Sequence, residues 1–343
     1  MTAPVIDLAL NLLNIPSPSG QEHQVQAYLE QLARERGFVV VRIPVDNPRY
    51  EPGRYNLLIS PDERDTPILL TTHVDVVPGG PQVGVSDGRL YGRGACDTKG
   101  IAAAMFCAFV DLCAAGHRDT SLLFVVGEET DSDGAKAAAA ALKPRSYFIN
   151  GEPTENRFVR VQRGVSMIEL SCEGVSCHSG YPELGHSAVH DLLPVLADIL
   201  NEPWPSDPVV GDTLINIGKI EGGKAANILA DHASALIMVR IATNSNALLE
   251  RFYKIVNGRA HMKVLTASDP QHLYVPPGAP ECNVGYGSDI AHLRPLGIPL
   301  MYGPGSIFQA HTEDEWIEID DLLAAQQVYR DICVKLAGEL SKR

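Results

Sequence analysis

Two histidines and five carboxylates stand where apolar, strand-like runs end, or in loops between such a run and a helix. These residues are His73, Asp75, Asp97, Glu128, Glu129, Glu152 and His311. Taken singly, each has an ordinary explanation as a loop acid or a hydrogen-bonded histidine. Taken together, five acids in one place would repel one another unless cations lay between them. Nitrogen and oxygen ligands suit zinc or a similar divalent ion, so the set predicts a two-metal site.

The first half of the chain alternates between strand-like and helix-like segments. We expect strands at 38–45, 56–60, 68–72, 121–126 and 146–150, and helices at 24–36, 99–115 and 134–142. Ser19 and Glu22 have the spacing of a capping box ahead of the first of these helices. The alternation predicts an α/β fold with a mainly parallel sheet flanked by helices. Reactive groups collect beyond the carboxyl ends of such strands, where most of the candidate residues lie.

The pattern changes after residue 164. Strand-like segments at 165–172, 214–220, 233–242 and 262–266 enclose helical segments at 187–200 and 246–256. The order βαββαβ predicts an inserted ferredoxin-like α+β domain. From residue 268 the chain returns to α/β character, with a strand at 299–302 and a helix at 320–340. We therefore expect a discontinuous catalytic domain, 1–163 and 268–343, interrupted by a domain at 164–267.

Charge and cysteine content narrow the function classes. The 343-residue chain has 42 acidic residues against 28 lysines and arginines, a formal charge of −14. This surplus argues against nucleic acid and anionic membranes as partners. The seven cysteines form no CxxC pair, which argues against a disulfide framework or a thiolate zinc cluster. With no export signal or membrane anchor visible, we expect a cytoplasmic protein.

The candidate residues stand in motifs that resemble one enzyme family across essentially the whole chain. The motifs are Ile15-Pro-Ser-Pro-Ser-Gly-Gln-Glu, His73-Val-Asp75-Val-Val-Pro, Gly92-Arg-Gly-x-x-Asp97-x-Lys-Gly, Glu128-Glu129, Gly151-Glu152-Pro-Thr, His178-Ser and His311. Their ordered set resembles the zinc-dependent metallopeptidases and N-deacylases that include acetylornithine deacetylase, succinyl-diaminopimelate desuccinylase and the aminoacylases. The resemblance implies two Zn²⁺ per subunit, with Co²⁺ or Mn²⁺ as substitutes.

The resemblance also implies a role for each candidate residue near the metals. His73 and Glu152 would bind one zinc, Glu129 and His311 the other, and Asp97 would bridge both. Asp75 would accept the ring N–H of a ligand histidine. Glu128 would be the general base that takes a proton from the water shared by the metals and delivers it to the leaving amine. The same pattern implies a cis peptide after Asp97.

Further residues carried over from the family lie mainly in the insert. His178 would reach across a homodimer interface, formed by the inserted lid domain, and stabilise the oxyanion. Asn227 and Arg240 would hold the oxyanion and the substrate carboxylate, with Arg163 as a further candidate at the expected hinge. Cys177 stands where the family usually has glycine. Ser288 and Gly303 lie in glycine-containing turns that would bring backbone N–H groups near the metals.

The substrate class rests on resemblance within the segment 302–316, which is most similar to acetylornithine and acetylcitrulline deacetylases. We therefore expect a hydrolase that removes a short acyl group, most simply acetyl, from an N-acyl amino acid such as N-acetylornithine. N-acetylcitrulline or another N-acyl amino acid is an alternative substrate. A dipeptidase or carboxypeptidase of the same family is a second alternative, and a non-catalytic binding relative is a third. The segment 78–91 is several residues shorter than in family members, which would alter the rim of the pocket.

Overall fold

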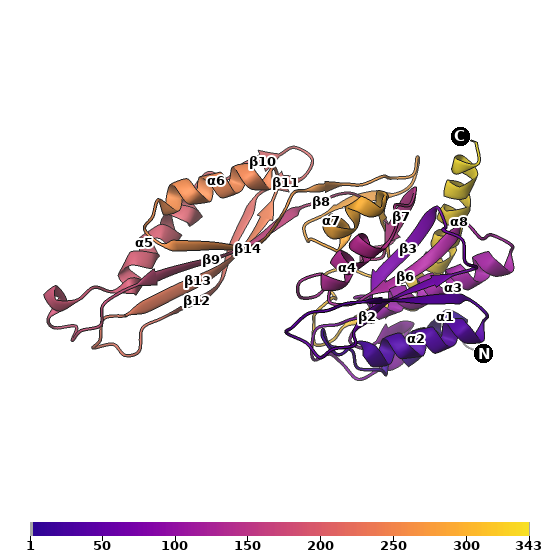
Figure 1. Ribbon diagram of the computed structural model, residues 1–343, viewed down its shortest axis with the longest axis horizontal. Helices are drawn as coiled ribbons and strands as arrows, with labels where there is room; N and C mark the ends of the chain where they lie inside the picture. Colours follow the sequence, from indigo (N-terminus) through magenta and orange to yellow (C-terminus); the bar gives the residue numbers. More distant parts are fainter. Residues whose placement is uncertain (1–2, 343) are drawn as a thin grey trace. The chain divides into compact units, whose positions relative to one another are not determined.

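The computed structural model describes residues 3–342 (Figure 1). The chain forms two compact units. The first consists of Met1–Arg160, Leu273–Cys282 and Ser288–Arg343, and the second of Val161–His272 and Asn283–Gly287. The chain therefore passes from one unit to the other four times. No helix between residues 3 and 342 is long and apolar enough to cross a bilayer.

A six-stranded sheet forms the centre of the first unit. In sheet order its strands are β1 (Val39–Pro44), β2 (Tyr55–Ser60), β6 (Thr120–Val125), β3 (Ile68–His73), β7 (Tyr147–Asn150) and β17 (Ile298–Met301). β6, β3, β7 and β17 are parallel, whereas β2 pairs antiparallel with both β1 and β6. Every residue of β3 and β6 is buried, because elements cover the sheet on both faces. The mainly parallel α/β sheet is confirmed.

The helices of the first unit bury the sheet. α3 (Lys99–Ala114) packs against β3 and β6 and also contacts α1 (Pro4–Leu13) and α8 (Ile319–Leu340). α2 (His23–Glu35) lies against β1 and β2, and α4 (Asp133–Ala141) contacts β1, β2, β6 and the short α7 (Ile290–Leu293). α3 is apolar on nearly every side because other helices and the sheet surround it. Its first residue follows the glycine-rich segment that contains Asp97.

Two features of the N-terminal region differ from the sequence-based expectations. The helix α1 was not predicted, although Pro4 occupies its first turn and its apolar residues recur at helical spacing. The predicted capping box is wrong, because α2 has Glu22 at its N-cap position and no side-chain cap hydrogen bond. Glu22 instead pairs with Arg54, and Ser19 donates to Asp75. Both side chains are used by partners distant in sequence.

The second unit is a four-stranded antiparallel sheet with two helices. Its strands in sheet order are β12 (Leu214–Gly222), β13 (His232–Ile241), β9 (Gly164–Glu173) and β14 (His261–Ser268). Alternate residues of β9 and β13 are buried against α5 (Ala188–Asn201) and α6 (Ser245–Val256). The element order is βαββαβ, with β9 and β13 in the middle of the sheet. This confirms the inserted ferredoxin-like domain.

Short elements complete the chain. β4 (Gly84–Ser86), β5 (Arg89–Tyr91) and β18 (Trp316–Glu318) form one small sheet, and β8 (Phe158–Gln162), β15 (Gln271–His272) and β16 (Glu281–Val284) form another. β10 (Ser206–Asp207) and β11 (Gly211–Asp212) form a two-stranded antiparallel sheet. Short 3₁₀ helices lie at Pro182–Leu184 and Arg294–Leu296. The pairing of β5 with β18 brings the loop before Asp97 close to the segment after His311.

Candidate metal centre

The candidate ligands lie beyond the carboxyl ends of adjacent parallel strands. His73 is the last residue of β3, Glu129 follows β6 and Glu152 follows β7. His311 lies in the loop between β17 and β18. Because β6, β3, β7 and β17 are parallel neighbours, these loops leave the sheet at the same edge.

Asp97 lies between two histidines. Its Oδ1 is 3.0 Å from Nε2 of His73, and its Oδ2 is 3.3 Å from Nε2 of His311. The same His311 nitrogen is 2.9 Å from Oε1 of Glu129. The peptide bond from Asp97 to Thr98 is cis, as predicted. One carboxylate thus presents a separate oxygen to each histidine, an arrangement that can bridge two metal ions.

The potential ligand atoms are close enough for shared coordination. Among the described residues, one ligand atom each from His73, Asp97 and Glu129 lie within 4.8 Å of one another. Glu152 is 5% exposed, and its Oε1 accepts a hydrogen bond from Asn150 Nδ2 at 3.2 Å. The structure therefore brings the five predicted ligands to one edge of the sheet, where their roles as ligands stay predictions.

The electrostatics of this cluster fit divalent cations. Burial raises the pKa of Glu128 and of Glu152 well above the usual value, and neighbouring carboxylates raise both further. Burial acts to lower the pKa of His73, but the neighbouring carboxylates of Asp75 and Asp97 raise it well above its usual value. Hydrogen bonds to Asp97 and Glu129 raise the pKa of His311 to about 10. In the absence of cations the site thus holds protons, and imidazole and carboxylate ligands are those that zinc prefers.

Asp75 is fully buried and connects three segments. Ser19 Oγ donates to its Oδ2 at 2.7 Å, and the backbone N–H groups of Glu128 and Glu129 donate to its two oxygens at 3.2 Å. His73 Nδ1 lies 3.6 Å from Asp75 Oδ1 and only 3.0 Å from the Asp75 carbonyl oxygen. The ring of His73 is therefore oriented mainly by the carbonyl group, while the carboxylate holds the chain at Glu128.

Glu315 was not singled out by sequence reasoning, although it is fully buried beside the Asp97 loop. Its Oε1 accepts hydrogen bonds from the backbone N–H groups of Gly94, Cys96 and Asp97 at 3.0–3.1 Å. Its Oε2 accepts from Arg93 Nη1 at 2.5 Å. A negative charge thus fixes the backbone that presents Asp97. The only signal in the sequence is its position four residues after His311.

Asp289 is a second buried acid that sequence reasoning missed. It is 1% exposed, and its Oδ1 has no hydrogen-bond partner among residues 3–342. Burial raises its pKa to about 7, although the charge of His73 and a hydrogen bond from Ser132 act to lower it. Its charge also acts on Glu128 and Glu152. Asp289 therefore adds to the negative charge that the cluster must balance.

Ser288 and Gly303 are both buried near turns of the first unit. Ser288 Oγ accepts from the N–H of Ile290 at 3.3 Å. The N–H of Gly303 donates to Thr154 Oγ1 at 2.9 Å, so it is already engaged within the chain. A Cβ at Gly303 would lie 2.3 Å from the carbonyl oxygen of Glu152. The glycine therefore permits close contact with the backbone of a candidate ligand.

In the second unit, His178 and Asn227 lie on neighbouring segments. The N–H of Ser179 donates to the carbonyl oxygen of Asn227 at 2.9 Å, and His178 forms an isolated bridge with Ile228. His178 is exposed, and its Nδ1 accepts from the N–H of Gly180 at 3.0 Å. The structure thus brings these two predicted substrate contacts together without a buried environment around them.

Arg240 and Arg163 form a second cluster in this unit. Arg240 lies on β13, and burial together with the charge of Arg163 lowers its pKa. Arg163 Nε donates to the carbonyl oxygen of Val210 at 3.2 Å. Within the part of the chain that the structure describes, no carboxylate pairs with either guanidinium. Two neighbouring positive charges without a counter-ion are suited to binding an anion.

Solved structures share this fold. A tripeptidase from Staphylococcus aureus superimposes with a TM-score of 0.78 at 22% identity, covering 95% of this chain and 96% of that one. An M20 family metallo-carboxypeptidase from Sulfolobus solfataricus superimposes with a TM-score of 0.76 at 15% identity, covering 96% of this chain and 98% of that one. At these identities the likeness establishes the fold alone.

Sequence relatives are closer. A peptidase M20 domain-containing protein of Schizosaccharomyces pombe is 34% identical over 95% of this chain and 83% of its own length. A probable carboxypeptidase of Aspergillus terreus is 34% identical over 96% of this chain and 86% of its own length. Residues 69–335 match the family model described as Peptidase family M20/M25/M40. With a candidate metal centre at the edge of this fold, the chain belongs to peptidase family M20/M25/M40.

Proposed function

We propose that the protein is a metal-dependent carboxypeptidase-type hydrolase, which cleaves an amide bond next to a free carboxylate. The observation that carries the proposal is the position of Asp97 between His73 and His311, with Glu128 beside the cluster. The names of the fungal relatives support peptidase activity more than the expected N-acetylornithine deacetylase activity.

Five residues of the first unit would hold two divalent cations, with zinc as the first choice and cobalt or manganese as substitutes. They are His73, Asp97, Glu129, Glu152 and His311. When bound, the cations would supply Lewis acidity to the scissile carbonyl and to the attacking water. The excess of buried carboxylates around His73 supports this assignment, since cations would balance their charge.

Glu128 would be the general base. It follows β6 directly before Glu129, and its backbone is held by Asp75. In the metal-free protein, burial raises the pKa of Glu128 well above its usual value. Beside bound cations the ionised carboxylate would act as the base. The side chain can then remove a proton from water and deliver it to the amine that leaves.

The second unit would supply the group that recognises the substrate carboxylate. Arg240 is half-buried beside Arg163, and a guanidinium can bind a carboxylate through two parallel hydrogen bonds. His178 and Asn227 would stabilise the oxyanion, and we expect the second unit to form a homodimer, so that His178 acts in the partner's site.

A second candidate is an N-acyl amino acid deacylase, with N-acetylornithine or N-acetylcitrulline as substrate. It is favoured by the segment 302–316, which contains His311 and resembles deacetylases of that type. Both candidate reactions hydrolyse an amide whose nitrogen belongs to an amino acid with a free carboxylate. The same residues would therefore serve either substrate.

A substrate panel separates the candidates. Metal-loaded protein is assayed with N-blocked dipeptides, with the same dipeptides carrying a C-terminal amide, and with N-acetylornithine, N-acetylcitrulline, N-acetyl-lysine and N-succinyl-diaminopimelate. We expect cleavage of the free-carboxylate dipeptides and at least tenfold slower cleavage of the amides. Faster hydrolysis of an acetyl amino acid would transfer the assignment to a deacylase. No hydrolysis of any compound would overturn both.

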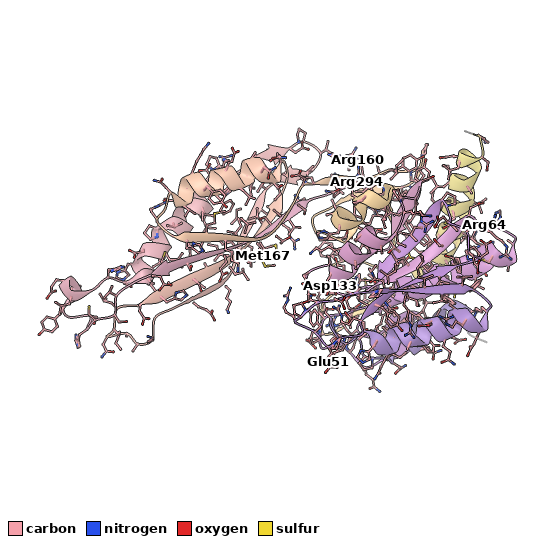
Figure 2. The ribbon with its side chains drawn as sticks, viewed as in Figure 1. Glu51, Arg64, Asp133, Arg160, Met167 and Arg294 are labelled. Carbon is pink, nitrogen blue, oxygen red and sulfur yellow. The ribbon has the colours of Figure 1, made fainter. Side chains whose placement is uncertain are left out.

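The role of Glu128 is tested by Glu128→Gln, which preserves shape and removes the base. We expect metal content to stay at the wild-type value while kcat falls by about 10²–10⁴. Glu51→Gln is a matched control, because Glu51 is an exposed acid of the same unit (Figure 2). Near wild-type turnover by Glu128→Gln would remove Glu128 from this role.

A further inference from the structure

Arg54 is a buried guanidinium with two carboxylate partners in the first unit. Arg54 is 3% exposed and directly precedes β2. Nε and Nη2 donate to the two oxygens of Glu22 at 2.9 and 2.7 Å, while Nη1 and Nη2 donate to those of Asp133 at 2.5 and 3.2 Å. Both pairs are bidentate, so the position of each carboxylate is fixed relative to the other.

The Asp133 partner lies against the loop that contains Glu128. Asp133 is the first residue of α4 (Figure 2). A Cβ at Gly127 would lie 2.1 Å from Asp133 Oδ1 and 2.9 Å from Arg54 Nη2, so the backbone beside Glu128 packs directly on this ion pair. Gly127 has a positive φ of 75°, and its carbonyl oxygen accepts from the N–H of Ser132 at 2.8 Å. The ion pair between Arg54 and Asp133 thus packs against the backbone of this loop.

Glu22, the other partner of Arg54, is connected to the loop that contains Glu128 through a second set of hydrogen bonds. Glu22 Oε1 accepts from the N–H of Gly20 at 2.9 Å, and the preceding Ser19 donates to Asp75. Asp75 in turn accepts from the N–H of Glu128. These contacts form a closed ring, in which Arg54 and Asp75 hold the backbone at Glu128 from two sides.

We propose that Arg54 is a positioning residue, which fixes the backbone of Glu128 through Asp133 and Gly127. The proposal rests on the proposed function of Glu128 as the general base. A buried ion pair contributes little net stability compared with apolar packing, so its bidentate geometry is the property that this role uses. A misplacement of a reacting group by about 1 Å can lower a rate about 10²-fold, which gives the scale of the effect.

Arg54→Lys tests the proposal because it keeps the positive charge and removes the planar set of donors. Arg42→Lys is the control, at a more exposed arginine of the same unit. Arg42 also pairs with a glutamate, at 2.7 Å from Glu30, and lies 4.5 Å from the Tyr55 ring, as Arg54 lies 4.5 Å from the ring of Tyr50. Arg42 is on β1, and within residues 3–342 no hydrogen bond or ion pair joins it to Gly127 or Glu128.

Two readouts are measured for each variant. In metal-free protein, we expect Arg54→Lys to raise amide hydrogen exchange at least tenfold in a peptide covering 127–133, and to leave a peptide covering β3 unchanged. In metal-loaded protein, we expect kcat to fall 10- to 100-fold with KM within twofold of wild type. Arg42→Lys is expected to leave both readouts at the wild-type values.

The exchange measurement needs no substrate, so it separates failure of this proposal from failure of the proposed function. Wild-type exchange at 127–133 in Arg54→Lys, or an equal rise throughout the first unit, would overturn the role of Arg54. If Arg54→Lys does not fold, Asp133→Asn replaces it, because that variant keeps the pairing of Arg54 with Glu22. It is expected to raise exchange in the same peptide, and unchanged exchange there would overturn the proposal.

Discussion

The carboxylate of Asp75 accepts a hydrogen bond from the backbone N–H of Glu128 at 3.2 Å, while the Asp75 carbonyl oxygen lies 3.0 Å from Nδ1 of His73. One residue therefore sets the distance between a proposed metal ligand and the proposed base. The carbonyl group fixes the histidine ring, and the carboxylate fixes the chain after β6. The two functions of Asp75 can be separated by changing only its side chain.

Asp75→Asn is expected to affect turnover more than the orientation of His73. The amide retains one acceptor oxygen but places an NH₂ group against a backbone N–H, so the loop at Glu128 must move. We expect kcat to fall 10- to 100-fold and metal affinity to fall by at most about tenfold, at the low end for partners of metal ligands. Steady-state kinetics and metal competition titrations measure both. Asp65→Asn, at a half-exposed acid that pairs with Lys143, is the control and should change neither.

Gly303→Ala is expected to destabilise the protein and lower metal affinity. Its Cβ would lie 2.3 Å from the carbonyl oxygen of Glu152, and neither backbone can move without displacing the other. We expect a loss of about 1–3 kcal/mol in the free energy of unfolding, typical of an overpacked site. Chemical denaturation measures this loss. Gly338→Ala, which meets nothing within 4 Å near the end of α8, should be neutral or slightly stabilising.

Asp289→Asn is expected to stabilise the metal-free protein at alkaline pH. The folded pKa of about 7 is above the unfolded value, so the folded state binds more protons between about pH 4 and 7. Wild-type stability therefore falls as pH rises through this window. The groups that act on Asp289 are His73, Asp75, Asp133 and Ser132. At pH 8 we expect Asp289→Asn to be more stable by on the order of 4 kcal/mol.

Denaturation of metal-free wild type and Asp289→Asn at pH 5 and pH 8 measures this difference. At pH 5 the folded carboxyl is protonated but the unfolded one is already ionised, so the difference between the two proteins should be about 2–3 kcal/mol smaller than at pH 8. Equal curves at both pH values would show that the acid is not held protonated by its surroundings.

Metal affinity is expected to fall as pH falls. In the metal-free protein the pKa values of His73 and Glu152 are raised well above their usual ranges, so both side chains hold protons that a metal must displace. Removal of metal with a chelator, followed by zinc titration between pH 8 and pH 6, should show at least a tenfold loss of affinity. Calorimetry in buffers of different ionisation enthalpy should show protons released on binding. An affinity independent of pH would contradict these protonation states.

Glu315→Gln is expected to lower stability and to loosen the loop that presents Asp97. The change leaves the guanidinium of Arg93 buried without its counter-ion, which costs about 3–5 kcal/mol when one partner of a buried pair is removed. Thermal unfolding and metal titration of the variant measure the two effects. Glu318→Gln, which removes a half-exposed partner of Arg89 on the same segment, should cost less than about 1 kcal/mol.

The elements that position the site were predictable because they are strongly patterned. The apolar runs before His73, Glu128 and Glu152 are strands buried on both faces, and such strands are nearly continuous in apolar residues. The alternating burial along β9 and β13 could likewise be predicted from the sequence, since only one face of these strands packs against helices. Strand ends in turn place the candidate ligands at one edge of the sheet.

The residues that hold the site in place were not predictable from local pattern. Glu315 lies 218 residues from Asp97 in sequence, and Arg54 lies 79 residues from Asp133. Ser19 and Glu22 had the spacing of a cap, but tertiary partners bind both side chains instead. Hydrogen bonds between distant segments leave no periodic signal, whereas burial of a strand or helix face does.

The four crossings between the units determine when the sheet can be completed during synthesis. β17 pairs with β7 only after the whole second unit has been made, and His311 is made later still. A ribosome-bound chain ending near residue 272 carries Asp97, Glu129 and Glu152 but lacks β17, the edge strand that completes the sheet. Truncation near residue 272 cannot yield a working first unit, because β17 and His311 are missing. In a circular permutant that begins at residue 288, the whole sheet and all five proposed ligands would be made before the inserted unit.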